Sequence, residues 1–593
     1  MSAEQLITQH IDTWTSALQT RSTAGRGNNG KIDLYGIKKL RELILELAVR
    51  GKLVPEDPND EPASELLKRI AAEKAELVKQ GKIKKQKPLA KINEDEKPFE
   101  LPVGWEWVKL GNLGTIGSSS RVHQRDWKQE GIPFYRAREI VTLARNGEVS
   151  NELFISHDLF KNLSESGLSP SVNDIMLTGV GTIGVPYIVK ENDIFYFKDA
   201  SVLIFKNYLN VDCNYLNKVF HSKYWNDEIH KQSMGTTVHT LTISRANEVL
   251  IPLAPEKHQI KLVSKIEELM SLCDQLEQQS LTSLEAHSQL VEALLATLTN
   301  SQNAEELAEN WARISQHFDT LFTTEASIDA LKQTILQLAV MGKLVPQDPN
   351  DEPASELLKR IEQEKAQLVK KGKIKKQKPL PPVSDEEKPF ELPEGWEWCR
   401  FEDIVDIQSG ITKGRNLVGR ELISVPYLRV ANVQRGHLDL SEIKKIDIPA
   451  DEKDKYQVKV DDLLITEGGD WDTVGRTAVW NDSSFYMANQ NHVFKARPIM
   501  NELNVKWVEI FMNSSVSRKY FASASKQTTN LASINKTQLR GCFIALPPIS
   551  ESSRILDKYI SLLNLFDGLK SQLQSAQQTQ LHLANVLTDA ALS

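Results

Sequence analysis

One segment of this chain occurs twice, 291 positions apart. Residues 51–70 read GKLVPEDPNDEPASELLKRI, and residues 342–361 repeat them with a single change, from Glu56 to Gln347. The ungapped alignment of 40–107 with 331–398 contains 51 identities in 68 positions. Two copies are too few for a repeat solenoid, so the feature predicts an internal duplication into two similar halves.

The segments that follow each copy have diverged, although a common skeleton remains. IPFYRAREI (132–140) corresponds to VPYLRVANV (425–433), and VNDIMLTGVGTIG (172–184) corresponds to VDDLLITEGGDWDTVG (460–475). Both pairs are rich in β-branched and aromatic residues between Gly, Asn and Asp turns. We therefore expect a compact, largely β domain in each half, attached to nearly identical helical regions.

Two long helices are expected after the variable segments. Apolar residues recur at alternating steps of four and three over 262–294 and over 555–587, which is the spacing of a coiled coil. Both stripes turn polar at one equivalent place, His287 and Gln580. The matched register favours packing of one stripe on the other, with two separately packed amphipathic helices as the alternative.

Composition limits the classes of function. The formal net charge of the 593-residue chain is −7, so a nucleic-acid partner would need a local basic surface. The four cysteines are scattered without CxxC or Cys/His pairing, which predicts reduced thiols, a cytoplasmic location and no zinc site. No apolar run has the length of a membrane helix, and the polar N-terminus is not a signal peptide.

Two equivalent segments concentrate positive charge within domains of balanced charge. Residues 121–138 carry five basic and two acidic side chains, and residues 413–435 carry five and one. A local surplus at matching positions predicts contact with DNA phosphates, with a solvated surface strip as the alternative. The basic residues are Arg121, Arg125, Lys128, Arg136 and Arg138 in the first segment, and Lys413, Arg415, Arg420, Arg429 and Arg435 in the second.

Base reading requires side chains that present paired donors and acceptors, as Arg does to guanine and Asn or Gln to adenine. The leading candidates are Arg136, Arg138, Arg429 and Asn432. Two polar loops, 235–240 and 526–531, are further candidates, with ordinary hairpin turns as the alternative. The residues chosen from these loops are Thr237, His239, Thr529 and Asn530.

Nearly identical lysine tracts follow the repeated block, VKQGKIKKQKPL at 78–89 and VKKGKIKKQKPL at 369–380. Side chains that read different sequences should differ, so these tracts are not expected to specify bases. Three interpretations of the tracts remain open: they bind phosphates without specificity, they dock to an acidic partner surface, or each is a solvated helix end. Upstream of each tract, Ser64 and Ser355 are predicted to cap a helix.

Motifs of DNA methylation chemistry are missing from the sequence. It contains no Asn/Asp-Pro-Pro-aromatic tetrapeptide, and the glycine cluster at 179–184 has a counterpart at 467–475, which favours a β-turn over a cofactor loop. Residues 25–32, GRGNNGKI, match GxxxxGK but carry Ile32 where a phosphate-binding loop needs Ser or Thr. We expect a flexible linker there, after a helix.

Together these motifs resemble the specificity (S) subunits of Type I restriction–modification enzymes. ELPVGWEWVKLGNLGTI (100–116) and ELPEGWEWCRFEDIVDIQSG (391–410) are similar to the openings of their target-recognition domains. VLIPLAPEKHQIKLVSKIEELMSLCDQLE (249–277) is similar to the exit from such a domain into its spacer helix, with a modest departure at APEKHQ. The repeated block is similar to that of a type IB-like subgroup.

The resemblance implies an α+β fold with two target-recognition domains of mixed α/β character. Two long conserved helices in an antiparallel coiled coil would separate them, with a pseudo-two-fold internal duplication. The expected parts are an N-terminal helical region (1–99), a first target-recognition domain (100–255), a central region with a spacer helix (256–390), a second target-recognition domain (391–548) and a C-terminal spacer helix (549–593).

The resemblance also implies a non-catalytic subunit that reads a bipartite, asymmetric DNA target. It would bind two modification subunits, which methylate adenine, and through them two restriction subunits. No cofactor is expected on this chain, while S-adenosylmethionine, ATP and Mg would act in the complex. A self-sufficient DNA methyltransferase or nuclease, and a coiled-coil adaptor for protein ligands, are the alternatives.

Overall fold

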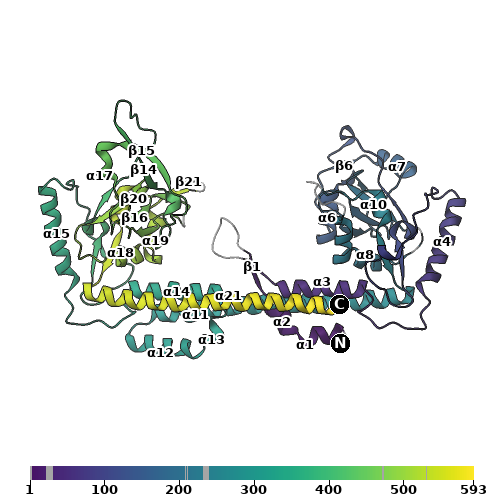
Figure 1. The fold of residues 1–593 in the computed structure, drawn as a ribbon, viewed down its shortest axis with the longest axis horizontal. Helices are drawn as coiled ribbons and strands as arrows, with labels where there is room; N and C mark the ends of the chain where they lie inside the picture. The colour runs from purple at the N-terminus through teal and green to yellow at the C-terminus, as the bar shows by residue number, and fades with distance from the viewer. Residues whose placement is uncertain are drawn as a thin grey trace. The chain divides into compact units, whose positions relative to one another are not determined.

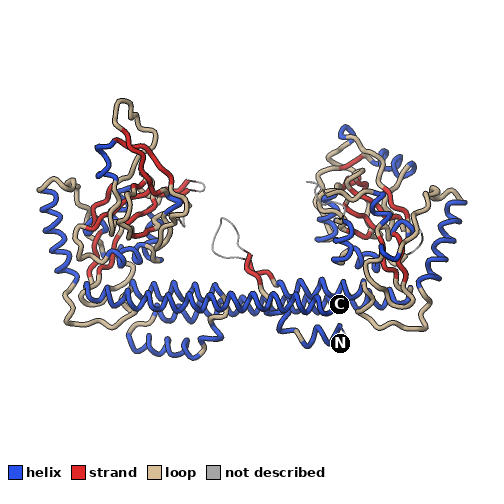
Figure 2. The backbone as a smooth tube through the Cα atoms, viewed as in Figure 1, coloured by secondary structure: helices blue, strands red, loops and turns tan. Residues whose placement is uncertain are grey.

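The computed structural model describes residues 3–21, 31–207, 209, 211–231, 239–470, 473–528 and 531–592. The chain divides into two compact units, residues 1–283 with 575–593 and residues 284–574. Each unit combines a strand-rich domain with helices of the repeated regions (Figures 1 and 2). None of the helices in the described ranges is long and apolar enough to cross a membrane.

The strand-rich domain of the first unit is closed by its own two ends. Strand β3 (Glu106–Lys109) follows the repeated block and pairs antiparallel with β11 (Leu250–Leu253), which leads into the long helix. Between them lie a four-stranded sheet of order β4-β10-β7-β8 and a three-stranded sheet of order β6-β5-β9. Their bounds are β4 (Thr115–Gly117), β5 (Ile132–Tyr135), β6 (Phe154–Ile155), β7 (Ile175–Thr178), β8 (Pro186–Ile188), β9 (Tyr196–Phe197) and β10 (Val202–Lys206).

Short helices cover this domain. An apolar core joins α6 (Ala137–Asn146) to the four-stranded sheet through buried residues such as Ile140, Met176 and Ile204. The remaining helices are α5 (Leu110–Leu113), η2 (Gln124–Asp126), α7 (His157–Ser166), α8 (Cys213–Phe220), α9 (Lys223–His230) and α10 (Ile243–Glu248). Helix and strand are therefore mixed in a domain whose sequence favoured strands.

The strand-rich domain of the second unit repeats this topology. Strand β12 (Glu397–Arg400) pairs with β23 (Phe543–Leu546), and the four-stranded sheet has the order β13-β20-β16-β18. Strand β14 pairs antiparallel with β15 and parallel with β19, as β5 does with β6 and β9. The bounds are β13 (Val405–Gln408), β14 (Leu422–Leu428), β15 (Lys444–Pro449), β16 (Leu463–Thr466), β18 (Thr477–Val479), β19 (Ala488–Asn489) and β20 (Val493–Pro498).

A further small sheet, β17-β22-β21, is specific to the second unit among the described residues. Its strands are β17 (Gly468–Gly469), β21 (Lys526–Thr528) and β22 (Leu531–Ser533). The helices of this domain are α16 (Phe401–Ile404), η4 (Val430–Asn432), η5 (Ala450–Glu452), α17 (Lys453–Tyr456), α18 (Val505–Met512), α19 (Ser515–Ala524) and α20 (Lys536–Gly541). The shared strand order shows that the duplication extends well past the point where sequence identity ends.

The two long helices, α11 (Glu256–Asn300) and α21 (Ile549–Leu592), run antiparallel. The first part of α11 shares a unit with the last part of α21, and the last part of α11 shares a unit with the first part of α21. In the second unit, Val291 and Leu295 of α11 and Phe566 of α21 lie in one buried cluster with α14 (Glu325–Val340). The two helices therefore pack together, as the matched stripes predicted.

The expected register of the stripes is correct only in its first part. Leu290 is 52% exposed, whereas Val291, Leu295 and Leu298 are buried. The second helix shifts in the same place, because Leu583 is 42% exposed and Ala584 is buried. A strict seven-residue repeat drifts around a helix of 3.6 residues per turn, so one extra residue returns the apolar side chains to the same face.

In the first unit, the corresponding bundle helix is α3 (Tyr35–Val49). Its Arg41 donates hydrogen bonds to Asp274 and Glu277 of α11, at 2.7 and 2.8 Å. Its Tyr35 hydroxyl donates to Asn585 Oδ1 of α21, at 2.8 Å. Helices of both conserved regions thus meet in one bundle.

The duplication also begins earlier than the sequence alignment indicated. QHIDTW (9–14) links α1 (Ala3–Gln9) to α2 (Ile11–Ser16), and QHFDTL (316–321) links α12 (Ala304–Gln316) to α13 (Phe318–Leu321). The two linking histidines have nearly the same backbone angles, φ −117° and ψ 24° at His10 and φ −114° and ψ 20° at His317. The offset there is 316 − 9 = 307 residues, against 291 in the repeated block, so the first copy carries 16 additional residues.

These additional residues include the glycine-rich stretch GRGNNGKI. Strands β1 (Gln19–Arg21) and β2 (Lys31–Asp33) pair on either side of it, and residues 22–30 lie outside the described residues. A strand pair therefore flanks the stretch, where the sequence indicated a linker directly after a helix. The helical periodicity of LITQHIDTWTSAL (6–18) is confirmed as far as Ser16, while a three-residue strand is too short to give a pattern.

The predicted helix caps are wrong. Helices α4 (Ala63–Lys79) and α15 (Ala354–Lys370) are capped by Pro62 and Pro353, and the two serines are the second helical residues. The backbone amides of Ala63 and Ala354 donate to the carbonyls of Gly104 and Gly395, each at 2.8 Å. A contact with the following GWEW segment therefore decides where each helix begins. The 3₁₀ turns η1 (Glu94–Glu96) and η3 (Asp385–Glu387) precede that segment.

The repeated block is attached to each strand-rich domain through a buried tryptophan. Gly51 and Gly342 adopt positive φ angles of 66° and 69°, and a Cβ atom on either would lie within 2.5 Å of a proline of the LPxGW motif. Trp105 Nε1 donates to Glu56 Oε1 at 3.0 Å, and Trp396 Nε1 donates to Glu551 Oε2 at 3.0 Å. Each junction thus combines close packing with a hydrogen bond to a carboxylate.

The carboxylate comes from different elements in the two junctions. In the first unit it belongs to Glu56 of the loop, and His258 of α11 places Nε2 3.2 Å from it. In the second unit the loop carries Gln347, which donates to Glu551 of α21 at 3.1 Å. Glu56 aligns with Gln347 and His258 with Glu551, so one acceptor for the tryptophan is kept while its position is exchanged.

This exchange predicts a compensating pair of substitutions. His258→Glu alone should lower the free energy of unfolding by about 3 kcal/mol, because it buries a second carboxylate beside Glu56 while the nearby Lys261 is already paired with Asp57 and Asp60. Adding Glu56→Gln recreates the arrangement of the second unit and should restore about 2 kcal/mol. Urea unfolding followed by tryptophan fluorescence measures both values. A double variant no more stable than His258→Glu would contradict the interpretation.

The same junction predicts a pH dependence. Burial, with a smaller contribution from Lys261, lowers the pKa of His258 from its usual 6.5. The unfolded chain therefore takes up a proton that the folded chain resists, and stability is lost as the pH falls through about 6.5. Burial raises the pKa of Glu56, which acts in the opposite direction and nearer its usual 4.5. The stability advantage of the wild type over His258→Gln should shrink from about pH 8 to about pH 5.5, and a constant difference would contradict the assignment.

Candidate nucleic-acid interface

The basic segment of the first unit runs from the end of β4 through η2 and β5 to α6. The side chains of Arg121, Arg125 and Lys128 are exposed. Arg125 Nε lies 3.8 Å from the neighbouring Asp126, and the part of the chain that the structure describes offers no ion pair to Arg121 or Lys128. These three residues therefore keep positive charge accessible to an anionic ligand.

Arg136 and Arg138 are engaged by carboxylates instead. Arg136 Nη2 lies 2.7 Å from Glu139 Oε1, and Arg138 Nη2 lies 2.6 Å from Glu152 Oε2. Burial of Glu139 favours its neutral form, but hydrogen bonds from Arg136 and Arg138 prevail and lower its pKa. Two arginines and two carboxylates make this patch locally neutral. Arg136 is also the N-cap residue of α6.

Folding adds acidic residues to the basic segment of the second unit. Arg420 Nη2 lies 2.6 and 2.7 Å from the two oxygens of Asp451, Arg415 is 2.8 Å from Glu452, and Arg429 is 3.3 Å from Glu442. None of these carboxylates falls within residues 413–435. The surplus counted along the sequence is therefore reduced in space. Lys413 remains exposed, with its ammonium 5.3 Å from the ring centre of Tyr427.

Asn432 is buried, with 3% of its surface exposed. Its Nδ2 donates to the carbonyls of Asp439 and Glu442 at 2.8 and 3.1 Å, and its Oδ1 accepts the Arg429 amide at 2.9 Å. These bonds hold the loop between η4 and β15. The assignment of Asn432 as a base reader stays a prediction. Its hydrogen bonds show that the side chain stabilises this loop. Arg435 is half-buried on the same loop.

The glycine clusters lie against the described ends of the polar loops, which are far from them in the sequence. Residues 179–184 and 467–475 are the connections of β7 with β8 and of β16 with β18, as expected for turns. In the first unit, Val180 bridges Thr240 and the Leu241 amide donates to the Gly179 carbonyl at 2.8 Å. In the second unit, β17 of the glycine loop pairs with β22.

Among the residues chosen from the polar loops, His239 is exposed, with its ring centre 5.2 Å from that of His230. Thr237, Thr529 and Asn530 lie outside the described residues.

In the second unit, Arg476 and Gln434 connect the glycine loop to the loop that follows η4. Arg476 Nη1 donates to Gln434 Oε1 at 2.9 Å, and the Gly436 amide donates to the Thr477 carbonyl at 3.0 Å. The loop that carries Gln434 and Arg435 therefore lies against the end of the glycine loop. The sequence held one signal for this site, because Gln434 is a donor–acceptor side chain next to a predicted DNA contact.

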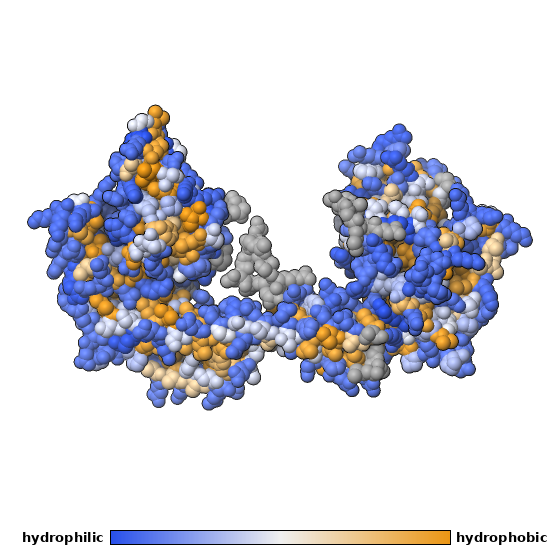
Figure 3. Space-filling view, in the orientation of Figure 1, coloured by the Kyte–Doolittle hydropathy of each residue, from blue (hydrophilic) through white to orange (hydrophobic). Residues whose placement is uncertain are grey.

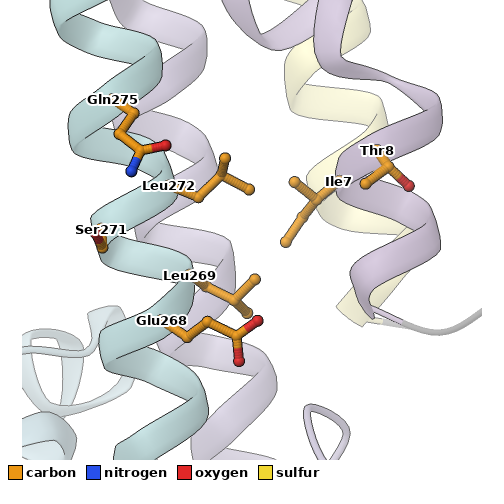
Figure 4. Close-up of a pocket in the computed structure, with 7 residues that line it drawn as sticks. All are labelled: Ile7, Thr8, Glu268, Leu269, Ser271, Leu272 and Gln275. Atoms are coloured by element: carbon orange, nitrogen blue, oxygen red, sulfur yellow. The ribbon is translucent and has the colours of Figure 1, made fainter.

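Two cavities lie among the described residues. One of about 360 Å³ lies between α1 and α11, where Ile7 faces Leu269 and Leu272 and the polar groups are Thr8, Glu268, Ser271 and Gln275 (Figure 4). Another, of about 830 Å³, borders Glu387, but the hydrogen bond from Arg400 lowers the pKa of that carboxyl to about 2. Within the described ranges, no three His, Cys, Asp or Glu side chains are grouped as metal ligands.

The four cysteines are free and buried. Burial raises the pKa of Cys273 to about 11, and it raises that of Cys399 as well. Thiols of this kind are poor nucleophiles, because the thiolate is the reactive form.

Comparison with known proteins decides the family. The model of the Type I restriction modification DNA specificity domain matches residues 102–286 and 393–575. The chain belongs to the family of Type I restriction–modification specificity subunits. Each match takes in one strand-rich domain and the adjoining part of a long helix, so the family model is matched once in each half of the duplication.

The similarity to known specificity subunits extends over the full chain. The EcoEI and EcoAI specificity subunits of Escherichia coli are each 48% identical to it, over 100% of this chain and 100% of their own length. The HsdS subunit from Thermoanaerobacter tengcongensis is 17% identical over 84% of this chain and 98% of its own, with a TM-score of 0.39. At that TM-score the structural likeness adds nothing to the assignment.

The geometry separates residues that hold the specificity subunit together from residues that remain accessible. Asn432→Ala should lower the free energy of unfolding by about 1–3 kcal/mol, because the Asp439 carbonyl and the Arg429 amide lose the partner that the buried Asn432 provides. Arg121→Gln should change it by less than about 0.5 kcal/mol, since the residue is exposed. Urea unfolding compares the two. Equal stability of both variants would show that the loop does not depend on Asn432.

Proposed function

We propose that this specificity subunit reads a bipartite, asymmetric DNA target, with one strand-rich domain on each half of the target. The observation that carries the proposal is the contrast within the duplication. The two domains share a strand order but differ in the residues of the basic segments and polar loops, whereas the repeated blocks 40–107 and 331–398 are identical at 51 of 68 positions. Different surfaces on one framework suit two different DNA sequences.

The repeated helical regions suit identical partners. We propose that they bind two modification subunits and, through these, two restriction subunits. The chain itself would be non-catalytic, and adenine methylation would belong to the modification subunits together with S-adenosylmethionine. ATP and Mg would act with the restriction subunits. We also keep the type IB-like subgroup and a cytoplasmic location, which the free cysteines favour, within this proposal.

The exposure and charge of several predicted contact residues support a DNA-binding surface. Arg121, Arg125, Lys128 and Lys413 present accessible charge for phosphates. Arg420 is paired with Asp451, but both side chains are exposed, at 43% and 72%. Exposed ion pairs contribute little stability, so such an arginine can exchange a carboxylate for a phosphate at small cost. We also keep five further arginines as candidate DNA contacts: Arg136, Arg138, Arg415, Arg429 and Arg435.

The test is a domain graft that leaves the junction intact. Residues 110–249 are replaced by the corresponding residues of a relative with a different target, so that β3, β11 and their ladder are retained. With the modification subunits present, mapping of methylated adenines should show a change in one half of the target only. A change in both halves, or in neither, would contradict the assignment of one domain to one half. With the modification subunits omitted, we expect no methylation.

A further inference from the structure

The two lysine segments, residues 79–87 and 370–378, are charged surfaces that the candidate interface does not include. Neither contains an acidic residue, and five lysines occupy equivalent positions in both. All ten of these side chains are exposed. They are Lys79, Lys82, Lys84, Lys85 and Lys87 in the first unit, and Lys370, Lys373, Lys375, Lys376 and Lys378 in the second.

The backbone of each lysine segment is held in place. At the end of α4, the Lys82 amide donates to the Leu77 carbonyl at 3.0 Å, and the Ile83 side chain is 9% exposed. At the end of α15, the Lys373 amide donates to the Leu368 carbonyl at 2.9 Å, and Ile374 packs against the core of the second unit. An isoleucine, buried in the first unit and partly buried in the second, thus anchors each segment while the lysines around it remain in solvent.

Each lysine segment lies at the end of its helix that is farther from the long helices, beside the strand-rich domain of its unit (Figure 1). The surface there is predominantly hydrophilic (Figure 3). In the second unit the segment also touches the domain, because Arg540 of α20 donates to the Lys378 carbonyl at 2.7 Å. Helix α20 follows β22 of the candidate interface, and Arg540 is also paired with Glu402, so this contact holds the segment against the domain.

More cations surround the second segment. Lys536 of α20 is half-buried, and this burial is the main reason that its pKa is lowered; the charge of Asp406 opposes the shift, while those of Arg540 and Lys375 add to it. Like charges gathered in this way attract counterions in solution. Their release is the main source of free energy when such a surface meets the phosphates of DNA.

We propose that both lysine segments bind the phosphate backbone of duplex DNA without sequence preference. This inference rests on the proposed function, since it assumes that the chain engages DNA. The segments are nearly identical although the domains beside them differ, and the phosphate backbone is likewise the same whatever the sequence. A chain with a net charge of −7 also needs local positive surfaces to approach DNA.

Residue type favours DNA over an acidic protein surface. All ten matched basic residues are lysines, and neither segment contains an arginine or an aromatic residue. Protein–protein interfaces are enriched in arginine and aromatic residues and depleted in lysine. Lysine is a hydrated point charge on a flexible stem, which suits contacts that need no fixed geometry. Ordering ten such side chains against a protein would also cost considerable conformational entropy.

The test removes four charges from one segment at a time. One full-length variant carries Lys82→Gln, Lys84→Gln, Lys85→Gln and Lys87→Gln, and a second carries Lys373→Gln, Lys375→Gln, Lys376→Gln and Lys378→Gln. A matched control loses four exposed lysines on helices outside the segments: Lys68→Gln, Lys257→Gln, Lys359→Gln and Lys558→Gln. Thermal unfolding checks that all three variants keep the stability of the wild type.

Binding to a short random-sequence duplex is measured by fluorescence anisotropy between about 50 and 200 mM salt. Each lost phosphate contact lowers the slope of log K against log salt by about 0.9, so each segment variant should lose about 2 to 4 from the slope. The slope of the control variant should stay within about 1 of the wild-type slope. Slopes of the segment variants equal to that of the control would overturn the proposal.

Two further measurements separate the possible failures. If the segment variants keep the wild-type slope but no longer co-purify with the modification subunits, the partner is a protein and the proposal is wrong. Preference for the mapped target over random sequence is measured for the wild type and both variants. We expect the preference to persist in the variants. A wild type that binds DNA through the segments without any such preference would refute the proposed function while upholding this inference.

Discussion

The junction between the repeated helices and each strand-rich domain is the contact on which the rest of the structure depends. A tryptophan of the LPxGW motif packs against a glycine that follows the bundle helix, and its indole N–H donates to a carboxylate, half-buried in the first unit and buried in the second. The glycine carbonyl of the same motif accepts the first amide of α4 or α15. The motif also leads directly into the strand that closes the domain, β3 or β12. Helical region and variable domain are therefore joined by one small set of interactions, made twice.

The exchange of the carboxylate shows what is kept in this junction. The acceptor for tryptophan comes from a loop in one unit and from a long helix in the other, with His258 or Gln347 as its neighbour. A buried indole N–H without a partner is costly, whereas the identity of the residue that satisfies it is of little consequence. Two copies can thus diverge in sequence at a buried site while the energetic requirement there is unchanged.

The proposed division of labour follows from the same constraint. Once the junction is fixed, the loops far from it are free to vary without disturbing the helices that are shared by both halves. The basic segments illustrate the limits of such variation, because half of their charge is used internally. Arg138 in one unit, and Arg415 and Arg420 in the other, each meet a carboxylate contributed by another part of the domain, and Arg136 meets Glu139 directly after the segment. The lysine segments have no such partners within them, and they are the part of the charged surface that the duplication preserves.

The sequence by itself determined the duplication, the helical and strand-rich regions, the packing of the two long helices and the turns at 179–184 and 467–475. These features rest on identity and on periodicity, which are local properties of a chain. It could not show that the apolar stripes shift by one residue after His287, because the drift of a straight helix accumulates only over many turns. It also could not show that helix α4 begins at Ala63, since the bond that decides this comes from Gly104.

The tertiary structure alone decided which charged residues remain available. A count along residues 413–435 includes Glu421 but omits Glu442, Asp451 and Glu452, which folding brings to the arginines. Asn432 has the side chain of a base reader, yet it is buried and bonded within its own loop. Ion pairs and burial depend on distances between residues remote in sequence, so they follow from the fold and not from any window of the chain.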